Sequence, residues 1–425
     1  MNRLLGSSEH LLWLLAQTKP INVVLCATIT GPLTIKQLTT ALTWVQHRHP
    51  LLAVRIVIDN HDQPRFVSEG VPSIPLRIIA RQGEEHWCQE VEEELLRPFS
   101  WSEGPLIRVV FLQSPDVSEL IVTFDHCIGD GLSGAYLIRD ILRQVSEPGI
   151  KQQRLPDPRS CEELIPLSAR GLSRDSVDED FENHKTAKSH LEVVTNRPSN
   201  QKILAKEQIR LLHWCLSPEE TARLLSCCRE KQTTVHGALC ASFLLSVADE
   251  VRSATETVLK CMSPVSLRNH LVQAIGEDFG AYYTRELTYH QIKAATDFWE
   301  VAREVKYQLN QVVAHGKIFA GVQKVKAFLS TKPDPSRLRQ YVKGLIGSDL
   351  TVTNLGRLNI PEQFSLLHLR ELYITVAGIA PIIVGVATLG DKMFVSCRYL
   401  NTVIPQACAE SINKGAMQRL REAIS

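Results

Sequence analysis

Two segments of the sequence share one order of predicted elements, and this repetition constrains the fold more than any other feature. The β-branched run 22–29 ends at Gly31-Pro32 and is followed at once by a helix that Thr34 can cap. The run 209–216 leads in the same way into Ser217-Pro218-Glu219-Glu220, whose residue types form a capping box with Pro at the first helical position. Strands that lead into amphipathic helices are typical of α/β structure. We therefore predict two related α/β halves.

The composition changes between residue 146 and about residue 207, and this predicts the domain boundary. A length of 425 residues is about twice that of one ordinary domain. Prolines cluster near 156–158, and 173–188 is rich in charges with almost no periodicity. A structureless segment of this length is unusual inside one compact domain. We predict lobes at 1–150 and 208–425, joined by a crossing, partly mobile linker at 151–207.

Charge, cysteine content and hydropathy exclude several classes of protein. Lys plus Arg (47) balance Asp plus Glu (46), so no overall field attracts nucleic acid or anionic lipid. The eleven cysteines include no C-x-x-C pair, and several, such as Cys26 and Cys240, lie in apolar runs, which argues against a metal site and a disulfide framework. No run of about 18 uncharged apolar residues is present to form a transmembrane segment. We expect a cytoplasmic, monomeric protein without a leader and without nucleic-acid partners.

The segment from Phe124 to Gly131 carries the chemistry that the sequence suggests. Of the fourteen histidines, only His126 has an aspartate, Asp130, four residues later. Gly129 and Gly131 argue against a continuous helix and allow a sharp reversal between the apolar strand before His126 and the helix after it. His126 is therefore predicted at the end of a buried strand, where a crevice often forms.

A neutral imidazole can remove a proton from an alcohol or an amine at pH 7, as acyl transfer requires. No G-x-S-x-G segment accompanies His126, so direct transfer fits better than a covalent acyl-enzyme. The alternative is a structural histidine at a strand end beside an acidic turn.

Four segments together resemble one superfamily. Asp125 to Gly131 is similar to the H-H-x-x-x-D-G signature shared by nonribosomal peptide condensation domains, plant BAHD acyltransferases and polyketide-associated acyltransferases. Gln46 to Leu52 resembles the end of the family's first helix, Pro264 to Arg268 its Pro-Val-x-x-Arg strand end, and Asp278-Phe279-Gly280 a BAHD segment. Their order and spread cover most of the chain.

The resemblance implies a fold and assigns roles to residues. The fold would be α/β (α+β type), with two chloramphenicol-acetyltransferase-like lobes, each a mixed sheet with flanking helices, and an active-site tunnel between them. His126 matches the catalytic second histidine, and Asp130 matches an aspartate that is mainly structural and pairs with an arginine, here Arg268. A buried carboxylate is costly unless neutralised, so this pair would hold the loop that carries the base. Gly131 and Asp125 would complete the support of that loop.

Further family segments would lie along the tunnel. Asp278, Phe279 and Gly280 are candidates for contact with the acceptor or the donor. Thr353-Asn354-Leu355-Gly356 is similar to a Ser/Thr-Asn-x-Gly segment, so Thr353 and Asn354 are candidates for stabilising the oxyanion. A simple turn that uses Asn and Gly for the backbone is the alternative.

The chain departs from the family pattern at two places. Asp125 replaces the first histidine, and Ala281-Tyr282 stand where BAHD enzymes have Trp-Gly. The first change leaves the base intact but could alter the packing of the loop or raise the pKa of His126.

The expected activity is cofactor-independent transfer of an acyl group, other than aminoacyl, from a thioester to the hydroxyl of a small molecule. No carrier or activation domain is evident, so the donor would be acyl-CoA or an acyl group on a separate carrier protein. Amide formation, as in condensation domains, and a non-catalytic acyl-carrier-binding module remain alternatives. Between Lys317 and Lys343, seven basic residues accompany one acidic residue. This patch is a candidate docking surface for CoA or the carrier, or else a solvated helix face; its named candidates are Lys324, Lys326, Arg337 and Arg339.

Overall fold

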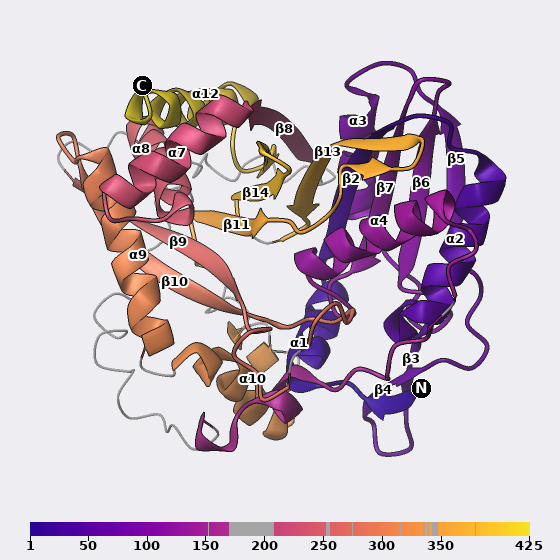
Figure 1. The fold of residues 1–425 in the computed structure, drawn as a ribbon. Helices are drawn as coiled ribbons and strands as arrows, with labels where there is room; N and C mark the ends of the chain where they lie inside the picture. Colours follow the sequence, from indigo (N-terminus) through magenta and orange to yellow (C-terminus); the bar gives the residue numbers. More distant parts are fainter. Residues whose placement is uncertain are drawn as a thin grey trace.

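The computed structural model describes residues 1–425 except 152, 170–207, 252–255, 274, 315–316, 335, 339, 342–346 and 379. Most of the predicted linker, and Arg339, therefore lie outside the described residues. Two six-stranded sheets form the frame of the molecule, one in each half of the view in Figure 1.

The first sheet has the strand order β12-β13-β2-β7-β6-β5, in which β5 runs parallel to β6 and the other pairs are antiparallel. The central strands β2 and β7 are buried along almost their whole length, as is typical of strands covered on both faces. Helices α2 and α4 lie side by side against this sheet (Figure 1). The strands are β2 (Asn22–Thr30), β5 (Leu76–Ala80), β6 (Ile107–Gln113), β7 (Val117–Asp125), β12 (Gln363–Phe364) and β13 (Leu367–Val376). The helices are α1 (Ser7–Ala16), α2 (Ile35–Arg48), α3 (His86–Leu96) and α4 (Gly131–Ser146).

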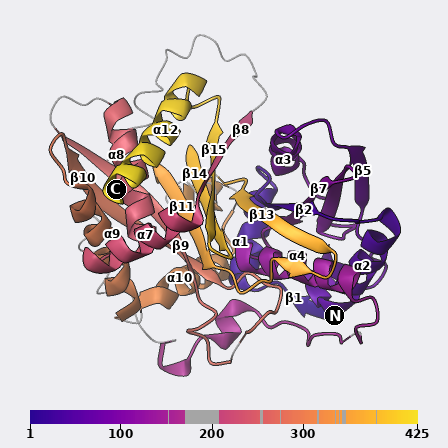
Figure 2. The ribbon, with the colours of Figure 1, turned by 45° about the horizontal axis from the view of Figure 1, so that its top comes forward.

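The second sheet has the order β10-β9-β11-β14-β15-β8, with β11 parallel to both of its neighbours. Helix α8 is apolar on all sides because it is enclosed by α9, α12 and the sheet (Figure 2). The strands are β8 (Ile209–Leu216), β9 (Glu256–Ser266), β10 (Tyr283–Lys293), β11 (Leu350–Arg357), β14 (Ile382–Leu389) and β15 (Lys392–Leu400). The helices are α7 (Pro218–Glu230), α8 (Val235–Val251), α9 (Phe298–Ala314), α10 (Ala320–Ser330) and α12 (Gln406–Ala423).

A small third sheet and four short helices complete the described structure. The sheet has the order β1-β4-β3, and its strands are β1 (Asn2–Leu4), β4 (Pro64–Val67) and β3 (Arg55–Ile58). The 3-10 helices span Pro50–Ala53, Cys161–Leu164, Leu167–Ala169 and Lys317–Phe319. The predicted fold class, two lobes with mixed sheets and flanking helices, is confirmed.

Both predicted helix caps are present. The Thr34 hydroxyl accepts from the Gln37 N–H at the start of α2, and the Ser217 hydroxyl accepts from the Glu220 N–H at the start of α7. The short strand β5 was not predicted, because its side chains are mostly half-buried and show no clear alternation.

Strand β13 belongs to the second half of the sequence but lies in the first sheet. It lies in the range assigned to the C-terminal lobe, yet it pairs antiparallel with β2, with Val376 opposite Val23. Its other paired neighbour is β12, and β14 and β15 of the second sheet also contact it. A Cβ at Gly385 would lie 1.9 Å from the Ile374 carbonyl oxygen, so only glycine allows β13 and β14 to approach this closely. The first hydrophobic core accordingly includes residues of both halves.

Within the described ranges, the structure holds no single helix with the length and apolar content needed to cross a membrane. The bent pair α7 and α8, at 97° to each other, meets the criteria of length and composition only as a pair, and α8 is largely buried in the protein.

Candidate functional site

His126 lies on the short turn between β7 and α4. Its Nδ1 is 2.8 Å from the Gly129 carbonyl oxygen. A carbonyl only accepts, so Nδ1 carries the proton and Nε2 keeps its lone pair. The side chain remains partly exposed, and burial lowers the pKa of His126 below its ordinary value. The ring is therefore a neutral base at neutral pH with a defined free nitrogen.

Tyr283, the first residue of β10, holds the plane of the His126 ring. The two rings stack with centroids 4.9 Å apart and an interplanar angle of 12°. Burial raises the pKa of Tyr283 to about 12, so its phenol stays neutral. Sequence reasoning missed Tyr283, because nothing in the sequence distinguishes it from Tyr282 beside it.

Asp130 and Arg268, predicted as a pair, meet in the structure. Arg268 Nη2 donates to both carboxylate oxygens of Asp130, at 3.0 and 3.1 Å. Both side chains are buried. Asp130 also caps α4, accepting from the backbone N–H and the hydroxyl of Ser133 at 2.8 Å each, and it accepts from the Tyr282 N–H at 3.2 Å. The loop that carries His126 is thus fixed to the strand end of the other half by a charged, hydrogen-bonded pair.

The Asp278-Phe279-Gly280 segment supports this loop from the far side. Arg268 Nη1 donates to the carbonyl oxygen of Asp278 at 3.0 Å, and the Gly280 carbonyl accepts from the Asp130 N–H at 3.2 Å. Phe279 is 2% exposed and meets Phe124 edge-on at 5.0 Å. Burial raises the pKa of Asp278. The structure thus shows Phe279 and Gly280 in packing and backbone contacts with the His126 loop.

Asp125 stands where the family signature has its first histidine. Its Oδ1 accepts from the Cys127 N–H at 3.0 Å, and its Oδ2 accepts from Trp101 Nε1 at 2.8 Å. The carboxylate is buried and satisfies two donors that shape the turn. Trp101 was not predicted, because only the fold brings it to the motif.

Thr353 and Asn354 lie in the middle of β11, three or four residues before its last residue, Arg357. Asn354 Oδ1 accepts from the Gly356 N–H at 2.8 Å, which is the turn that the sequence offered as an alternative. Asn354 Nδ2 has no hydrogen-bond partner within the described ranges. Next to Asn354, Leu355 reaches Gly131, where an added Cβ would lie 2.8 Å from Leu355 Cδ2. The segment is therefore adjacent to the His126 loop.

The basic candidates that the structure describes lie on α10 and in the segment that follows it. Lys324 and Lys326 are exposed on α10, whose buried side is formed by Val322 and Val325, and Arg337 is exposed as well.

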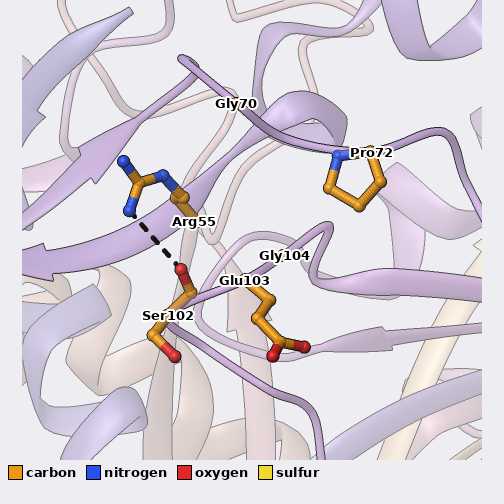
Figure 3. Close-up of a pocket in the computed structure, with 6 residues that line it drawn as sticks. All are labelled: Arg55, Gly70, Pro72, Ser102, Glu103 and Gly104. Carbon is orange, nitrogen blue, oxygen red and sulfur yellow. Dashed lines mark hydrogen bonds between the residues drawn. The ribbon is translucent and has the colours of Figure 1, made fainter.

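A surface hollow of about 500 Å³ lies elsewhere in the first half, and no predicted site residue lines it (Figure 3). Arg55 Nη1 donates to the Ser102 carbonyl across it at 3.5 Å. Its lining residues are Arg55, Gly70, Pro72, Ser102, Glu103 and Gly104.

Comparison with known proteins shows a family match over part of the chain and a shared fold over nearly all of it. Residues 205–382 match the family described as "Phthiocerol/phthiodiolone dimycocerosyl transferase C-terminus". Polyketide synthase associated protein 5 from Mycobacterium tuberculosis superposes over 99% of this chain and 97% of its own, with a TM-score of 0.69 and 16% identity. The chain therefore shares the fold of this protein, and residues 205–382 are similar to the matched family.

Two further solved structures have a similar fold. The first condensation domain of the calcium-dependent antibiotic synthetase covers 100% of this chain and 96% of its own, with a TM-score of 0.72 and 15% identity. Trichothecene 15-O-acetyltransferase from Fusarium sporotrichioides covers 100% and 95%, with a TM-score of 0.70 and 14% identity.

A curated relative is similar in sequence over part of its length. Phosphinothricin tripeptide synthetase PhsC from Streptomyces viridochromogenes is 28% identical over 187 residues, which are 41% of this chain. The matched region spans 17% of that synthetase.

Proposed function

We propose that this chain is an acyltransferase that moves an acyl group from a thioester, on CoA or on a carrier protein, to a hydroxyl of a small molecule. One observation carries the proposal. The Nδ1–H of His126 is bound to Gly129, so Nε2 is left as an unprotonated base on a partly exposed ring.

The proposed reaction uses the lone pair of His126 Nε2 as the base. Nε2 of His126 takes the proton of the acceptor hydroxyl while the oxygen attacks the thioester carbonyl carbon. The tetrahedral intermediate then collapses, the C–S bond breaks, and the leaving thiolate takes the proton from Nε2. No acyl-enzyme forms, and the imidazole ends in its starting state.

The geometry also supports a donor for the oxyanion. Among the residues that the structure describes, the amide NH₂ of Asn354 has no hydrogen-bond partner, and its segment adjoins the His126 loop through Leu355 and Gly131. We assign Nδ2 of Asn354 to the developing negative charge of the carbonyl oxygen. A well-placed donor of this kind contributes about 10²-fold or more to the rate.

Release of free thiol tests the proposal. Wild-type protein, His126→Ala and the control His61→Ala, on an exposed turn, are given a panel of acyl-CoAs with alcohols, and the thiol is followed with a coloured disulfide reagent. Loss of the base is expected to lower the rate by about 10²- to 10⁴-fold, with no effect at His61. If wild type and His126→Ala released thiol at the same low rate, the proposal of an enzyme that uses His126 as its base would be wrong.

Amide formation is the second candidate, and the sequence comparisons favour it. Phosphinothricin tripeptide synthetase is among the similar proteins, and its name denotes peptide synthesis. Paired acceptors that differ only in OH or NH₂ distinguish the two reactions, since the preferred nucleophile gives the larger kcat/KM with the same acyl donor. A protein that binds an acylated carrier yet turns over neither acceptor would instead be the binding module considered above.

A further inference from the structure

A second group of chemically reactive side chains lies where the two halves of the molecule meet, away from His126. Glu85 precedes α3, Cys88 lies in the first turn of α3, and His213 lies on β8. Among the described residues, this is the one group of three whose donor atoms all lie within 4.8 Å of one another. It consists of one carboxylate, one thiol and one imidazole.

The distances within the group suit a tetrahedral metal ion. His213 Nε2 lies 3.1 Å from Glu85 Oε2, and Cys88 Sγ lies 3.4 Å from the same oxygen. With bonds of about 2.0–2.1 Å to N and O and about 2.3 Å to S, the edges of a tetrahedral zinc site measure roughly 3.3–3.6 Å. Small side-chain adjustments would therefore bring all three donors to bonding distance around one ion.

Two of the three donors, Cys88 on α3 and His213 on β8, lie on regular elements, and Glu85 lies in the turn before α3. Trp87 stacks on Tyr373 at 4.9 Å, and the His213 ring contacts both of these aromatic rings, at 4.9 and 5.2 Å. Glu92, one turn further along α3, accepts from the backbone N–H of Leu211 at 2.9 Å and so fixes β8 against α3. Rigid elements and an apolar wall on one side are the surroundings in which a metal site is preorganised.

We propose that Glu85, Cys88 and His213 form a binding site for a zinc-type divalent cation that joins the two halves of the chain. Three protein ligands would leave the fourth position to water. On binding, the Sγ–H bond of Cys88 breaks, its proton passes to solvent, and the thiolate binds the metal. The site is independent of the acyl-transfer function proposed above.

The simpler account of the group is a set of ordinary polar contacts. Burial and the Glu85 carboxylate raise the pKa of the Cys88 thiol, which then donates to Glu85. The two accounts differ in whether an added metal replaces that thiol proton. The sequence analysis argued against a metal site, because His213 lies 125 positions from Cys88 and the two form no short ligand motif.

Cobalt(II) is the probe that separates these accounts, because its visible bands report coordination number and its near-ultraviolet band reports a thiolate ligand. Metal-stripped full-length protein is titrated with Co²⁺ and then with Zn²⁺. For the wild type we expect intense four-coordinate bands with a thiolate band, both abolished by Zn²⁺. A wild-type spectrum that stays that of hydrated, six-coordinate Co²⁺ would overturn the proposal.

Matched variants locate the metal. Cys88→Ser is expected to remove the thiolate band, and His213→Asn to weaken Co²⁺ binding by at least about tenfold, since even the loss of a residue that only supports a ligand costs about 10- to 100-fold. Cys227→Ser removes a partly exposed thiol on α7 and is expected to change nothing. Thiolate bands that persist in Cys88→Ser, or disappear in Cys227→Ser, would contradict the assignment. Zn²⁺ is also expected to raise the Tm of the wild type but not that of Cys88→Ser.

Discussion

At the scale of single residues, the state of His126 sets the pH dependence of the proposed reaction. Burial lowers the pKa of His126 below 6.5, and the reaction needs the unprotonated ring. We expect kcat/KM to be constant near pH 7 and to fall about tenfold per pH unit only below that lowered pKa. A pH–rate profile measures this, and an acidic limb centred above pH 6.5 would show that another group is the base.

The pair of Arg268 and Asp130 makes a second prediction at this scale. Arg268→Ala would leave the Asp130 carboxylate buried and without its cation, which typically costs about 3–5 kcal/mol. We expect urea unfolding to show this loss, together with lower activity because the His126 loop loses its anchor. The double variant Arg268→Ala/Asp130→Asn is expected to recover part of the stability, since the uncompensated charge is gone. An Arg268→Ala protein as stable and active as wild type would reject the role of the pair.

The sequence identified the residues of the site that belong to local patterns, and missed those that only the fold brings together. His126, Asp130 and Arg268 lie in recognisable segments, and the structure places them in one cluster. Tyr283 and Trp101 act on that cluster by ring stacking and by a single hydrogen bond, and neither contact has a spacing that sequence could reveal.

At the scale of elements, the connection from β7 to α4 depends more on Gly129 than on the glycine of the signature itself. A Cβ at Gly129 would lie 2.4 Å from the buried Phe279 ring, which is held against Phe124. A Cβ at Gly131 would meet the methyl ends of Ile374 and Leu355, which can rotate away.

We therefore expect Gly129→Ala to cost about 1–3 kcal/mol of stability and much of the activity, and Gly131→Ala to cost less. Urea unfolding and thiol release measure both quantities. Gly129→Ala/Phe279→Leu tests the cause, because a smaller side chain at 279 is expected to return part of the loss. If Gly131→Ala lowered stability more than Gly129→Ala, the contact between an added Cβ at 129 and the Phe279 ring would not be the reason why this connection needs a glycine.

The strands and helices with strong periodicity and clear caps were predictable from the sequence, but the sheet to which each strand belongs was not. The apolar sequence of β13 fits a strand in either sheet. Its position in the chain, within 208–425, favoured the second sheet. Its true partner, β2, lies more than 300 residues earlier, and only the register and the close approach at Gly385 select it.

At the scale of the whole molecule, the shared strand predicts one cooperative unfolding transition for both halves. The first hydrophobic core runs through β2, β13 and parts of β15 without a break between the halves. Hydrogen exchange is therefore expected to give the same opening free energy for the slowest amides of β2 and β14. Separate transitions for the two sheets would contradict this coupling.

A substitution in the shared strand tests the same coupling. Leu372 on β13 is fully buried, so Leu372→Ala is expected to lower the stability of both sheets together by about 2–5 kcal/mol. Leu225→Ala, on the exposed side of α7, is the control and is expected to change stability by no more than about 0.5 kcal/mol. A loss confined to the first sheet would mean that β13 does not link the halves energetically.

The pairing of β13 with β2 also limits how the reactants of the proposed acyl transfer would enter. A hinge that swung the halves widely apart would have to peel a ten-residue strand from β2 and break its ladder of hydrogen bonds. Loading and release are therefore expected to proceed by small shifts of loops and side chains around His126, with the two sheets keeping their mutual orientation through every turnover.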